Sequence, residues 1–355
     1  MTDRQRLELN SLLPQDLEAL AKAESWPAFR GRQIFRWLQE KGVDRFDEMT
    51  NLPRSLRERL EQIAAITTLQ PLARYDAAAG DTHKLLLELH DGERIETALM
   101  LYHKQASRDR ATCCISSQSG CRMGCAFCAT GLIPEGRNLS AGEIVRQVQK
   151  MTPLAREAGF SGITNVVFMG MGEPLLNLEN VHRALLLLNH AEGLHIGMRR
   201  MTISTCGIVP KIEEMCGWGL QVGLAVSLHA PTDALRDRLM PINRKYPLAA
   251  LLPACRAYAR ASGQKITYEY ALFAGINDGQ KNAHLLAKLL AAENCLINII
   301  PANPVAETGF SPPEVEEIED FCRIVASYGL EVQRREERGR DIEAACGQLR
   351  RRTLE

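Results

Sequence analysis

The chain has 355 residues, of which 45% are hydrophobic and 24% are charged. This composition is typical of a globular protein and excludes a disordered or fibrous chain, and the length suffices for one large domain or two ordinary ones. Lysine plus arginine and aspartate plus glutamate each total 43, so the overall charge does not indicate a polyanionic partner. Any nucleic-acid surface must come from charges gathered on one face.

The N-terminal sequence MTDRQRLELN lacks the apolar core of a signal peptide. No apolar run approaches the roughly 20 residues that span a bilayer. We therefore expect a cytoplasmic protein that does not enter a membrane. In that reducing compartment, eleven cysteines argue for metal or thiol chemistry and against a disulfide scaffold.

Residues 1–88 are predicted to form a small helical accessory domain. Two charge-rich segments within it, 29–43 and 49–63, are predicted as helices, and Pro53 stands near the expected start of the second. The apolar run 85–101 surrounds an Asp-Gly turn, which predicts a β-hairpin leading into the main domain, residues 89–355.

From about residue 111, short β-rich apolar runs alternate with helical segments. Six runs are present: TCCISS, NVVFMG, MTISTC, GLAVSLH, KITYEYALF and CLINIIPAN. Their alternation with helices predicts an α/β fold with a parallel sheet. Six units are too few for a complete barrel, so a partial barrel and an open doubly wound sheet both fit, and both gather ligands at the C-terminal strand ends. The residues expected to share that rim are Glu173, Ser204, His229 and Asn303.

Three cysteines, Cys121, Cys125 and Cys128, follow the first run with the spacing C-x3-C-x2-C. A four-iron cubane normally takes four thiolates, so three leave one iron open. The amino and carboxylate groups of S-adenosylmethionine can chelate that iron. The alternative is a zinc site with three cysteines and one histidine, but no histidine lies between His103 and His182 to complete it.

The segment FMGMGEPLLN closes the second run. Gly170 and Gly172 allow the backbone to approach a ligand closely, and the Glu173 carboxylate can accept from an amino group. A glycine-rich turn between a strand and a helix is as often purely structural when it stands alone. Next to the three cysteines, it indicates a site for the amino group of S-adenosylmethionine.

Several longer segments carry a closer resemblance: CISSQSGCRMGCAFCATG, RNLSAGEIVRQV, NVVFMGMGEPLLNLENV, LAVSLHAPTDALRDRLMPINRKYPL, NIIPANPV and RREERGRDIEAACGQL. Over nearly its whole length the chain resembles the dual-specificity adenine-C2 methyltransferases of 23S rRNA and tRNA, a family of the radical S-adenosylmethionine superfamily. The resemblance implies a TIM-like partial barrel of six strand-helix units. It also implies a [4Fe-4S] cluster on the three cysteines and S-adenosylmethionine as methyl donor and radical source.

The resemblance also implies a mechanism. One S-adenosylmethionine methylates Cys346, and a second yields a 5'-deoxyadenosyl radical that removes a hydrogen from that methyl group, which then adds to C2 of adenine. Cys114 releases the covalent adduct by forming a transient disulfide with Cys346. Glu96, in RIETALML, matches the family's proton acceptor. Cys113 adjoins Cys114, and on a strand only one of the two can face the site.

The same match implies the remaining site residues and the substrates. The targets are adenine 2503 of 23S rRNA and, as a further expected substrate, adenine 37 of tRNAs. The residues expected to contact S-adenosylmethionine are Gly172, Glu173, Ser204, Ser227, Leu228, His229 and Asn303.

RNA binding requires exposed cations and access to the base. A ring carbon is reached only in a flipped or unstacked adenosine. Candidate phosphate contacts are Arg137, Arg199, Arg200, Arg244, Lys245, Arg334 and Arg335, although each one alone is more typical of a solvated surface. We expect the N-terminal domain to help dock RNA, an electron donor such as flavodoxin to act as partner, and the chain to be a monomer.

Three alternatives stay open. The C8-methylating relative associated with antibiotic resistance shares the cysteine triad and both catalytic thiols. A radical enzyme acting on protein or a small molecule would leave Cys114 and Cys346 without a task. A zinc or iron-sulfur RNA-binding module would not cleave S-adenosylmethionine.

Overall fold

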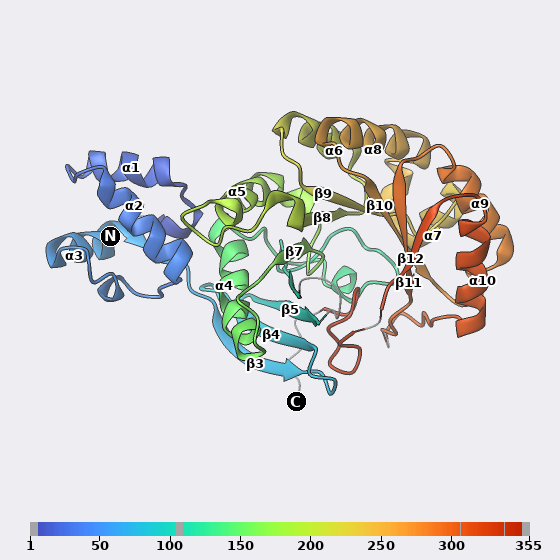
Figure 1. The fold of residues 1–355 in the computed structure, drawn as a ribbon, viewed down its shortest axis with the longest axis horizontal. Coiled ribbons are helices and arrows are strands. Elements are labelled where there is room, and N and C mark those ends of the chain that lie inside the picture. The colour runs from blue at the N-terminus through green and yellow to red at the C-terminus, as the bar shows by residue number, and fades with distance from the viewer. Residues whose placement is uncertain (1–5, 104–108, 306, 337, 350–355) are drawn as a thin grey trace.

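The computed structural model describes residues 6–103, 109–305, 307–336 and 338–349. An N-terminal helical unit lies against one flank of a larger α/β body (Figure 1). Its elements are β1 (Leu7–Glu8), α1 (Pro14–Ala23), α2 (Phe29–Arg36), α3 (Arg54–Ile63) and β2 (Ala64–Ala65).

Both helices predicted in this unit are confirmed. A π-helical turn, Trp37–Lys41, continues α2, and Gly42 ends it with a φ of 66°. Pro53 precedes the first residue of α3, where its fixed φ and missing N–H are tolerated.

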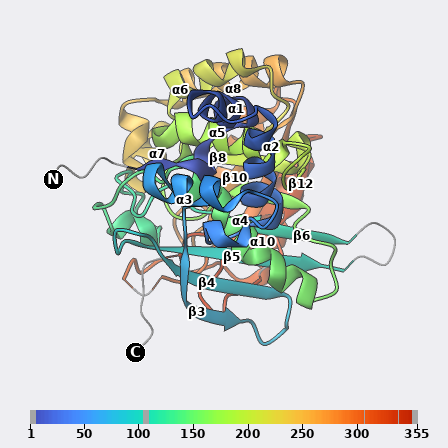
Figure 2. The ribbon, with the colours of Figure 1, turned by 90° about the vertical axis from the view of Figure 1, so that its left-hand side faces the viewer.

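One mixed sheet of ten strands forms the body, in the order β12-β11-β10-β9-β8-β7-β6-β5-β4-β3. Its antiparallel part consists of β3 (Gln70–Asp76), β4 (Thr82–Glu88), β5 (Arg94–Tyr102) and β6 (Arg110–Cys114). Figure 2 shows β3, β4 and β5 below the N-terminal helices α1, α2 and α3. The hairpin predicted around the Asp-Gly turn is confirmed as β4–β5, with Glu88 opposite Arg94.

From β6 onward, neighbouring strands are parallel. The further strands are β7 (Asn165–Phe168), β8 (Met201–Thr205), β9 (Gly223–Ser227), β10 (Ile266–Leu272), β11 (Cys295–Pro301) and β12 (Glu331–Arg334). The helices that cover the outside of the sheet are α4 (Ala141–Glu157), α5 (Leu178–Asn189), α6 (Val209–Met215), α7 (Asp233–Leu239), α8 (Leu248–Ser262), α9 (Gln280–Leu290) and α10 (Val315–Ala326) (Figure 1). The sheet is open, so the fold is a partial barrel.

The predicted α/β partial barrel is confirmed, and the six predicted runs are β6 to β11. The sequence did not indicate β12, because three of its four residues are polar and all four are half-buried or exposed. Strands β3 and β4 lie between residues 70 and 88 and pair within the ten-stranded sheet. The helical part of the N-terminal segment is therefore shorter than 1–88 and ends at Ile63.

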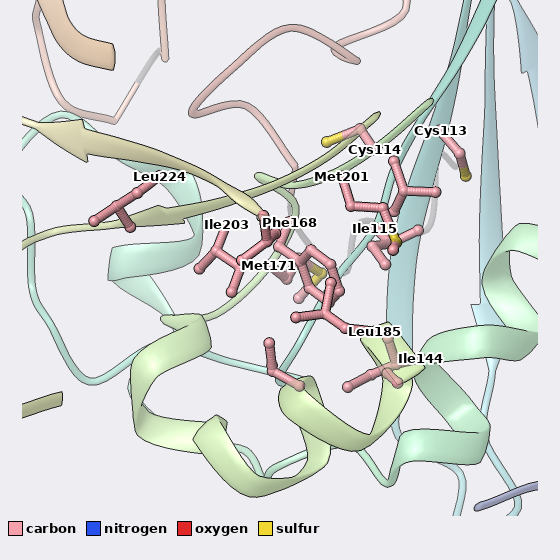
Figure 3. Packing of buried hydrophobic residues seen from close by; sticks show 14 of the residues in the cluster. Cys113, Cys114, Ile115, Ile144, Phe168, Met171, Leu185, Met201, Ile203 and Leu224 are labelled. Carbon is pink, nitrogen blue, oxygen red and sulfur yellow. The ribbon is translucent and has the colours of Figure 1, made fainter. Parts of the chain in front are cut away.

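The main core lies between the sheet and its covering helices. Figure 3 shows Phe168 and Ile203 of adjacent strands, with Ile115 just after β6, facing Ile144 of α4 and Leu185 of α5. All five side chains are buried. Within the described residues, no helix has the length and apolarity needed to cross a membrane.

Candidate functional site

A cavity opens at the C-terminal ends of the parallel strands, and we call it the rim cavity. Its walls come from the loop after β6, the ends of β7 to β11 and the C-terminal segment, and it encloses about 980 Å³ including its mouth. The predicted site residues that line it are Cys121, Cys125, Cys128, Gly172, Glu173, Ser204, Ser227, His229, Asn303 and Cys346. These residues, distant in sequence, therefore meet in one place.

The three-cysteine loop is held in place by backbone hydrogen bonds to distant segments. Ala126 N donates to Leu239 O, the last residue of α7, at 2.9 Å. Ala129 N donates to Gly347 O in the C-terminal segment at 2.8 Å. Because the backbone is fixed on both sides of Cys128, the loop presents its thiols to the cavity.

Burial raises the pKa of all three thiols. It raises that of Cys121 to about 12, and in Cys125 the neighbouring thiols of Cys128 and Cys121 add to the effect of burial. Among the described residues, no three His, Cys, Asp or Glu side chains converge as ligands of one metal ion. The three thiols share one cavity, and in a cubane each thiolate binds a different iron, so the residues present fit such a cluster.

The two glycines of the turn after β7 allow a close approach of two backbones. A Cβ on Gly170 would lie 2.7 Å from Ile115 O, and one on Gly172 would lie 2.6 Å from the Gln118 side chain. Gly172 also has a φ of +98°, which other residues rarely adopt. The turn can therefore lie against the loop after β6 only with glycine at both positions.

Glu173 follows these glycines and is buried. Its Oε1 accepts from Leu175 N at 3.0 Å, and its Oε2 accepts from Cys206 N at 2.8 Å. Burial raises the pKa of the carboxyl group, and these two hydrogen bonds oppose the rise. The carboxylate is thus oriented at the cavity wall, where a ligand ammonium group can compensate its charge.

His229 is held as a neutral hydrogen-bond donor. Its Nδ1 accepts from Ala271 N at 2.9 Å, so the proton resides on Nε2. Burial lowers the pKa of the imidazole to about 3, with a further contribution from Arg236. The residue has a φ of 56°, and its carbonyl accepts from Asn277 Nδ2 at 2.8 Å.

Leu228 lies outside the described lining of the rim cavity. Its side chain is fully buried, and its backbone N donates to Glu269 O at 2.9 Å. Leu228 therefore reaches the cavity region only through the backbone that it shares with Ser227 and His229.

Cys346 lies on a C-terminal segment, residues 338–349, that closes one side of the rim cavity. Asn303 Nδ2 donates to Cys346 O at 3.0 Å, and Thr130 Oγ1 donates to Leu349 O at 2.6 Å. Lys84 Nζ of β4 donates to Glu343 O at 3.3 Å. The segment is therefore attached at the same time to the residues after β11, to the three-cysteine loop and to the antiparallel strands.

Cys114 and Cys346 line a second, smaller cavity that adjoins the rim cavity. Burial raises the pKa of the Cys114 thiol, and the nearby Cys346 adds to the rise. Cys113 lies on the other face of β6, where its Sγ is 3.8 Å from Thr97 Oγ1 (Figure 3). Of the two adjacent cysteines, Cys114 is the one that lines this cavity together with Cys346. All eleven cysteines are free thiols, so the predicted Cys114–Cys346 disulfide is not formed in this state.

Arg335 lies between the two thiols and the barrel interior. It lines both the rim cavity and the cavity of Cys114 and Cys346. The nearby Cys346 thiol is the main cause that raises the pKa of Arg335, and Glu269 contributes. Asn298 Nδ2 donates to Glu269 at 2.9 Å, and burial raises the pKa of that carboxyl group.

Glu96 lies on β5 and is buried. Its Oε1 is 3.4 Å from Lys84 Nζ, and it is absent from the described lining of both cavities. Ala98, two residues along, is directly opposite Cys114. Because side chains alternate along a strand, Glu96 and Cys114 lie on the same face of the sheet.

Four of the seven predicted phosphate contacts fall into two groups. The other three lie outside the lining of the cavity described next: Arg199 donates through Nε to Gln221 Oε1 at 2.9 Å, and Arg244 and Lys245 are exposed after α7. Arg200, Arg334 and Arg335 line a further cavity in the N-terminal half of the barrel interior, together with Arg110, and we call it the lower cavity. Arg137 instead donates through Nη1 and Nη2 to Glu143, at 2.8 Å each. The cations that line the lower cavity therefore come from the start of β6, from the end of β12 and the residue after it, and from the residue before β8.

Sequence reasoning missed two charged residues that lie at or behind the cavity wall. Arg236 is fully buried beside the ends of β8 and β9, although its segment ALRDRL is typical of an exposed helix. Glu269 lies within an apolar strand, and a charged residue in such a run was the available signal.

Comparison with known proteins gives the family. The radical SAM superfamily model matches residues 115–286, and the model of the ribosomal RNA large subunit methyltransferase N-terminal domain matches residues 7–66. A crystal structure of a radical SAM methyltransferase from Sphaerobacter thermophilus superimposes with a TM-score of 0.92 at 44% identity. The superposition covers 98% of this chain and 100% of the Sphaerobacter chain.

Similar proteins match the sequence of this chain over nearly its full length. The protein named "Probable dual-specificity RNA methyltransferase RlmN" of Moorella thermoacetica is 49% identical over 97% of both chains. The protein of the same name from Heliobacterium modesticaldum is 46% identical, covering 98% of this chain and 94% of its own. The radical SAM family uses a [4Fe-4S] cluster and S-adenosylmethionine. The chain therefore belongs to the RlmN family of dual-specificity RNA methyltransferases and is a radical enzyme that depends on S-adenosylmethionine.

Proposed function

We propose that the enzyme forms 2-methyladenosine at adenine 2503 of 23S rRNA and at adenine 37 of tRNAs, through a methylated Cys346. The observation that carries the proposal is that Cys346 lines both the rim cavity and the cavity of Cys114. One thiol is thus next to the three-cysteine loop on one side and next to a second thiol on the other. A radical enzyme acting on other substrates would need no such pair.

The proposed site holds two cofactors. Cys121, Cys125 and Cys128 would hold the cluster, which, when bound, supplies the electron that generates the 5'-deoxyadenosyl radical from S-adenosylmethionine. The Glu173 carboxylate would accept from the amino group of S-adenosylmethionine, and Nε2 of neutral His229 would donate. The remaining proposed contacts are the Gly172 backbone, Ser204, Ser227, the Leu228 backbone and Asn303.

The two thiols have consecutive tasks. Cys346 would accept a methyl group, lose a hydrogen from it and bond through that carbon to C2 of the base. The adduct would give up its C2 proton and one electron, the electron returning to the cluster that the three cysteines would hold. The Cys114 thiolate would then attack the sulfur of Cys346, so that an S–S bond forms as the C–S bond breaks, and the product carbon would keep the electron pair of that bond and take up a proton to become the methyl group. Arg335 would favour the thiolate that this attack needs, since burial alone disfavours it.

Glu96 is proposed as the acceptor of the C2 proton. Its place on the same face of the sheet as Cys114 supports this role. Its pairing with Lys84 means that the carboxylate must exchange partners to reach a base, and Lys84 also binds the carbonyl of Glu343 in the C-terminal segment. A movement of that segment would therefore change the surroundings of Glu96 and Cys346 together.

RNA would approach through the open side of the barrel. Arg200 and Arg334 are exposed and line the lower cavity with Arg335, which also lines the rim cavity. Phosphate groups bound there would lead an unstacked adenosine toward Cys346. The N-terminal unit is proposed to extend this docking surface. We further propose a flavodoxin-like electron donor, a monomer and a cytoplasmic location, where both RNAs occur.

Anaerobic turnover tests the proposal. Protein with a reconstituted cluster is incubated with S-adenosylmethionine, a reductant and unmodified 23S rRNA or tRNA, and nucleosides are identified by mass spectrometry against 2-methyl and 8-methyladenosine. The 2-methyl product is expected from both RNAs. The 8-methyl product would reassign the chain to the C8 chemistry, and 5'-deoxyadenosine without either product would show that the substrate is another molecule.

A further inference from the structure

Arg236 of α7 is a buried cation whose hydrogen-bond partners are neutral. Its exposed fraction is 0%. Nη2 donates to Cys206 O at 2.7 Å and to Ser227 O at 3.0 Å. Nε donates to Leu228 O at 3.2 Å, and Nη1 donates to Asn243 Oδ1 at 2.9 Å. Such a charge is costly to bury unless an anion compensates it.

The Asp233 carboxylate on the same helix acts electrostatically on Arg236, and so do the thiols of Cys206 and Cys125, with the larger effects. The position of Arg236 shows where a further anion belongs. The carbonyls that it binds lie at the ends of β8 and β9, and both Cys206 and Ser227 line the rim cavity. Leu239, on the same helix, accepts the backbone N–H of Ala126 from within the three-cysteine loop. The guanidinium group also acts electrostatically on the Cys125 thiol. The cation therefore lies behind the wall of the cavity, next to the proposed cluster ligands.

We propose that Arg236 is the fixed positive charge of the iron-sulfur site and raises the reduction potential of the cluster. The inference rests on the cluster assignment of the proposed function. Three thiolates make the site anionic, and reduction adds one more negative charge, so a nearby cation stabilises the reduced form more than the oxidised form. Arg236 does not line the cavity, and it acts as a positioning residue through its charge and its carbonyl partners.

The backbone of Cys206 connects the Arg236 guanidinium to Glu173. Its N–H donates to Glu173 Oε2 at 2.8 Å, while its carbonyl accepts from Arg236 at 2.7 Å. Removal of Arg236 could thus disturb both the potential and the orientation of Glu173. A purely structural role would change stability and the binding of S-adenosylmethionine, but it would leave the potential of the ligand-free cluster unaltered.

A redox titration monitored by electron paramagnetic resonance separates these roles. Wild type is compared with Arg236→Gln, which removes the charge, and with Asn243→Ala, which removes one partner of the same guanidinium and leaves the charge. We expect Arg236→Gln to lower the ratio of reduced to oxidised cluster at a fixed potential by tenfold or more, which corresponds to about 59 mV for one electron. Asn243→Ala should change that ratio less than twofold.

A second variant covers the case in which Arg236→Gln does not fold. Asn243 Nδ2 donates to Asp237 Oδ1 at 2.7 Å and to Asp233 Oδ1 at 3.0 Å. The double variant Asn243→Asp with Asp237→Asn therefore exchanges an amide and a carboxylate and keeps the net charge. It places the new carboxylate in contact with Arg236 on one side and Asp233 on the other. We expect the double variant, like Arg236→Gln, to lower the ratio of reduced to oxidised cluster.

The outcomes are distinct. Unchanged potentials in the folded charge variants would overturn the inference, as would an equal shift in Asn243→Ala. A wild-type protein that binds no iron-sulfur cluster would instead overturn the proposed function.

Discussion

The two groups of proposed catalytic cysteines are assembled in different ways. Cys121, Cys125 and Cys128 lie within eight residues of one another, on a loop fixed by backbone hydrogen bonds. Cys114 and Cys346 are separated by most of the barrel and meet only because the C-terminal segment returns to β6. The first group depends on local spacing, and the second depends on the complete fold. The two groups should therefore fail in different ways when they are changed.

The largest effect is expected from the local group. Cys125→Ala should prevent stable cluster assembly, because two thiolates remain, and should lower 5'-deoxyadenosine formation by at least about a thousandfold, as expected when the site that generates the radical is lost. Iron content and 5'-deoxyadenosine are measured in the same preparation. Cys216→Ala, on the far side of the barrel, is the matched control and should behave as wild type. Normal iron content in Cys125→Ala would contradict the assignment.

The second group should fail later in the reaction. Cys114→Ala should retain the cluster and 5'-deoxyadenosine formation, yet stop at the covalent adduct between Cys346 and RNA, because no thiol is left to release it. The adduct is detected as a slowly migrating band in denaturing electrophoresis. Cys113→Ala is the control, since its side chain lies on the opposite face of β6. Equal amounts of adduct in both variants would show that the wrong cysteine has been assigned.

A smaller effect is expected at the open side of the barrel. If Arg200 and Arg334 each bind one phosphate, replacing both with Gln should lower the slope of log affinity against log salt by about 2. RNA binding is measured by filter retention between low and moderate salt. Arg137→Gln is unsuitable as a neutral control because of its pair with Glu143, whereas Arg260→Gln on α8 is suitable. A slope identical to that of wild type would exclude these contacts.

The smallest effect concerns stability and pH. The pKa of His229 is about 3 in the folded chain, below the usual value near 6.5, so the unfolded chain binds more protons between these values. The stability that the folded chain gains from neutral His229 is complete above about pH 6.5 and is lost as the pH falls toward 3. In His229→Gln the slope of unfolding free energy near pH 5 should fall by about 1.4 kcal/mol per pH unit. Urea titrations at several pH values measure the slope, and a slope in His229→Gln equal to that of wild type would contradict the prediction.

The sequence predicted the parts of the molecule that depend on local pattern. Six strands, the β4–β5 hairpin and the cysteine loop all follow from short-range periodicity and spacing. The polar strand β12 was missed, because an edge strand with exposed side chains lacks an apolar run. The burial of Arg236 was missed for a related reason: only the tertiary fold determines that this face of α7 lies against the ends of β8 and β9.

The pairing of Cys114 with Cys346 could be expected only from the family resemblance. Cys346 lies on a segment without helix or strand, so no periodicity predicts where it goes. Its position is set by hydrogen bonds from Asn303, Thr130 and Lys84 to carbonyls of the segment. Any residue offers such a carbonyl, and the sequence therefore contains no specific sign of these contacts.

The hydrogen bonds from Ala129 and Thr130 to the carbonyls of Gly347 and Leu349 have a consequence for oxygen tolerance. They join the three-cysteine loop to the segment that carries Cys346, and the proposed mechanism requires that segment to move. Each opening would expose the cluster side of the rim cavity to dissolved gas. Damage by air should therefore scale with the number of catalytic cycles as well as with time, and idle enzyme should outlast working enzyme under the same trace of oxygen.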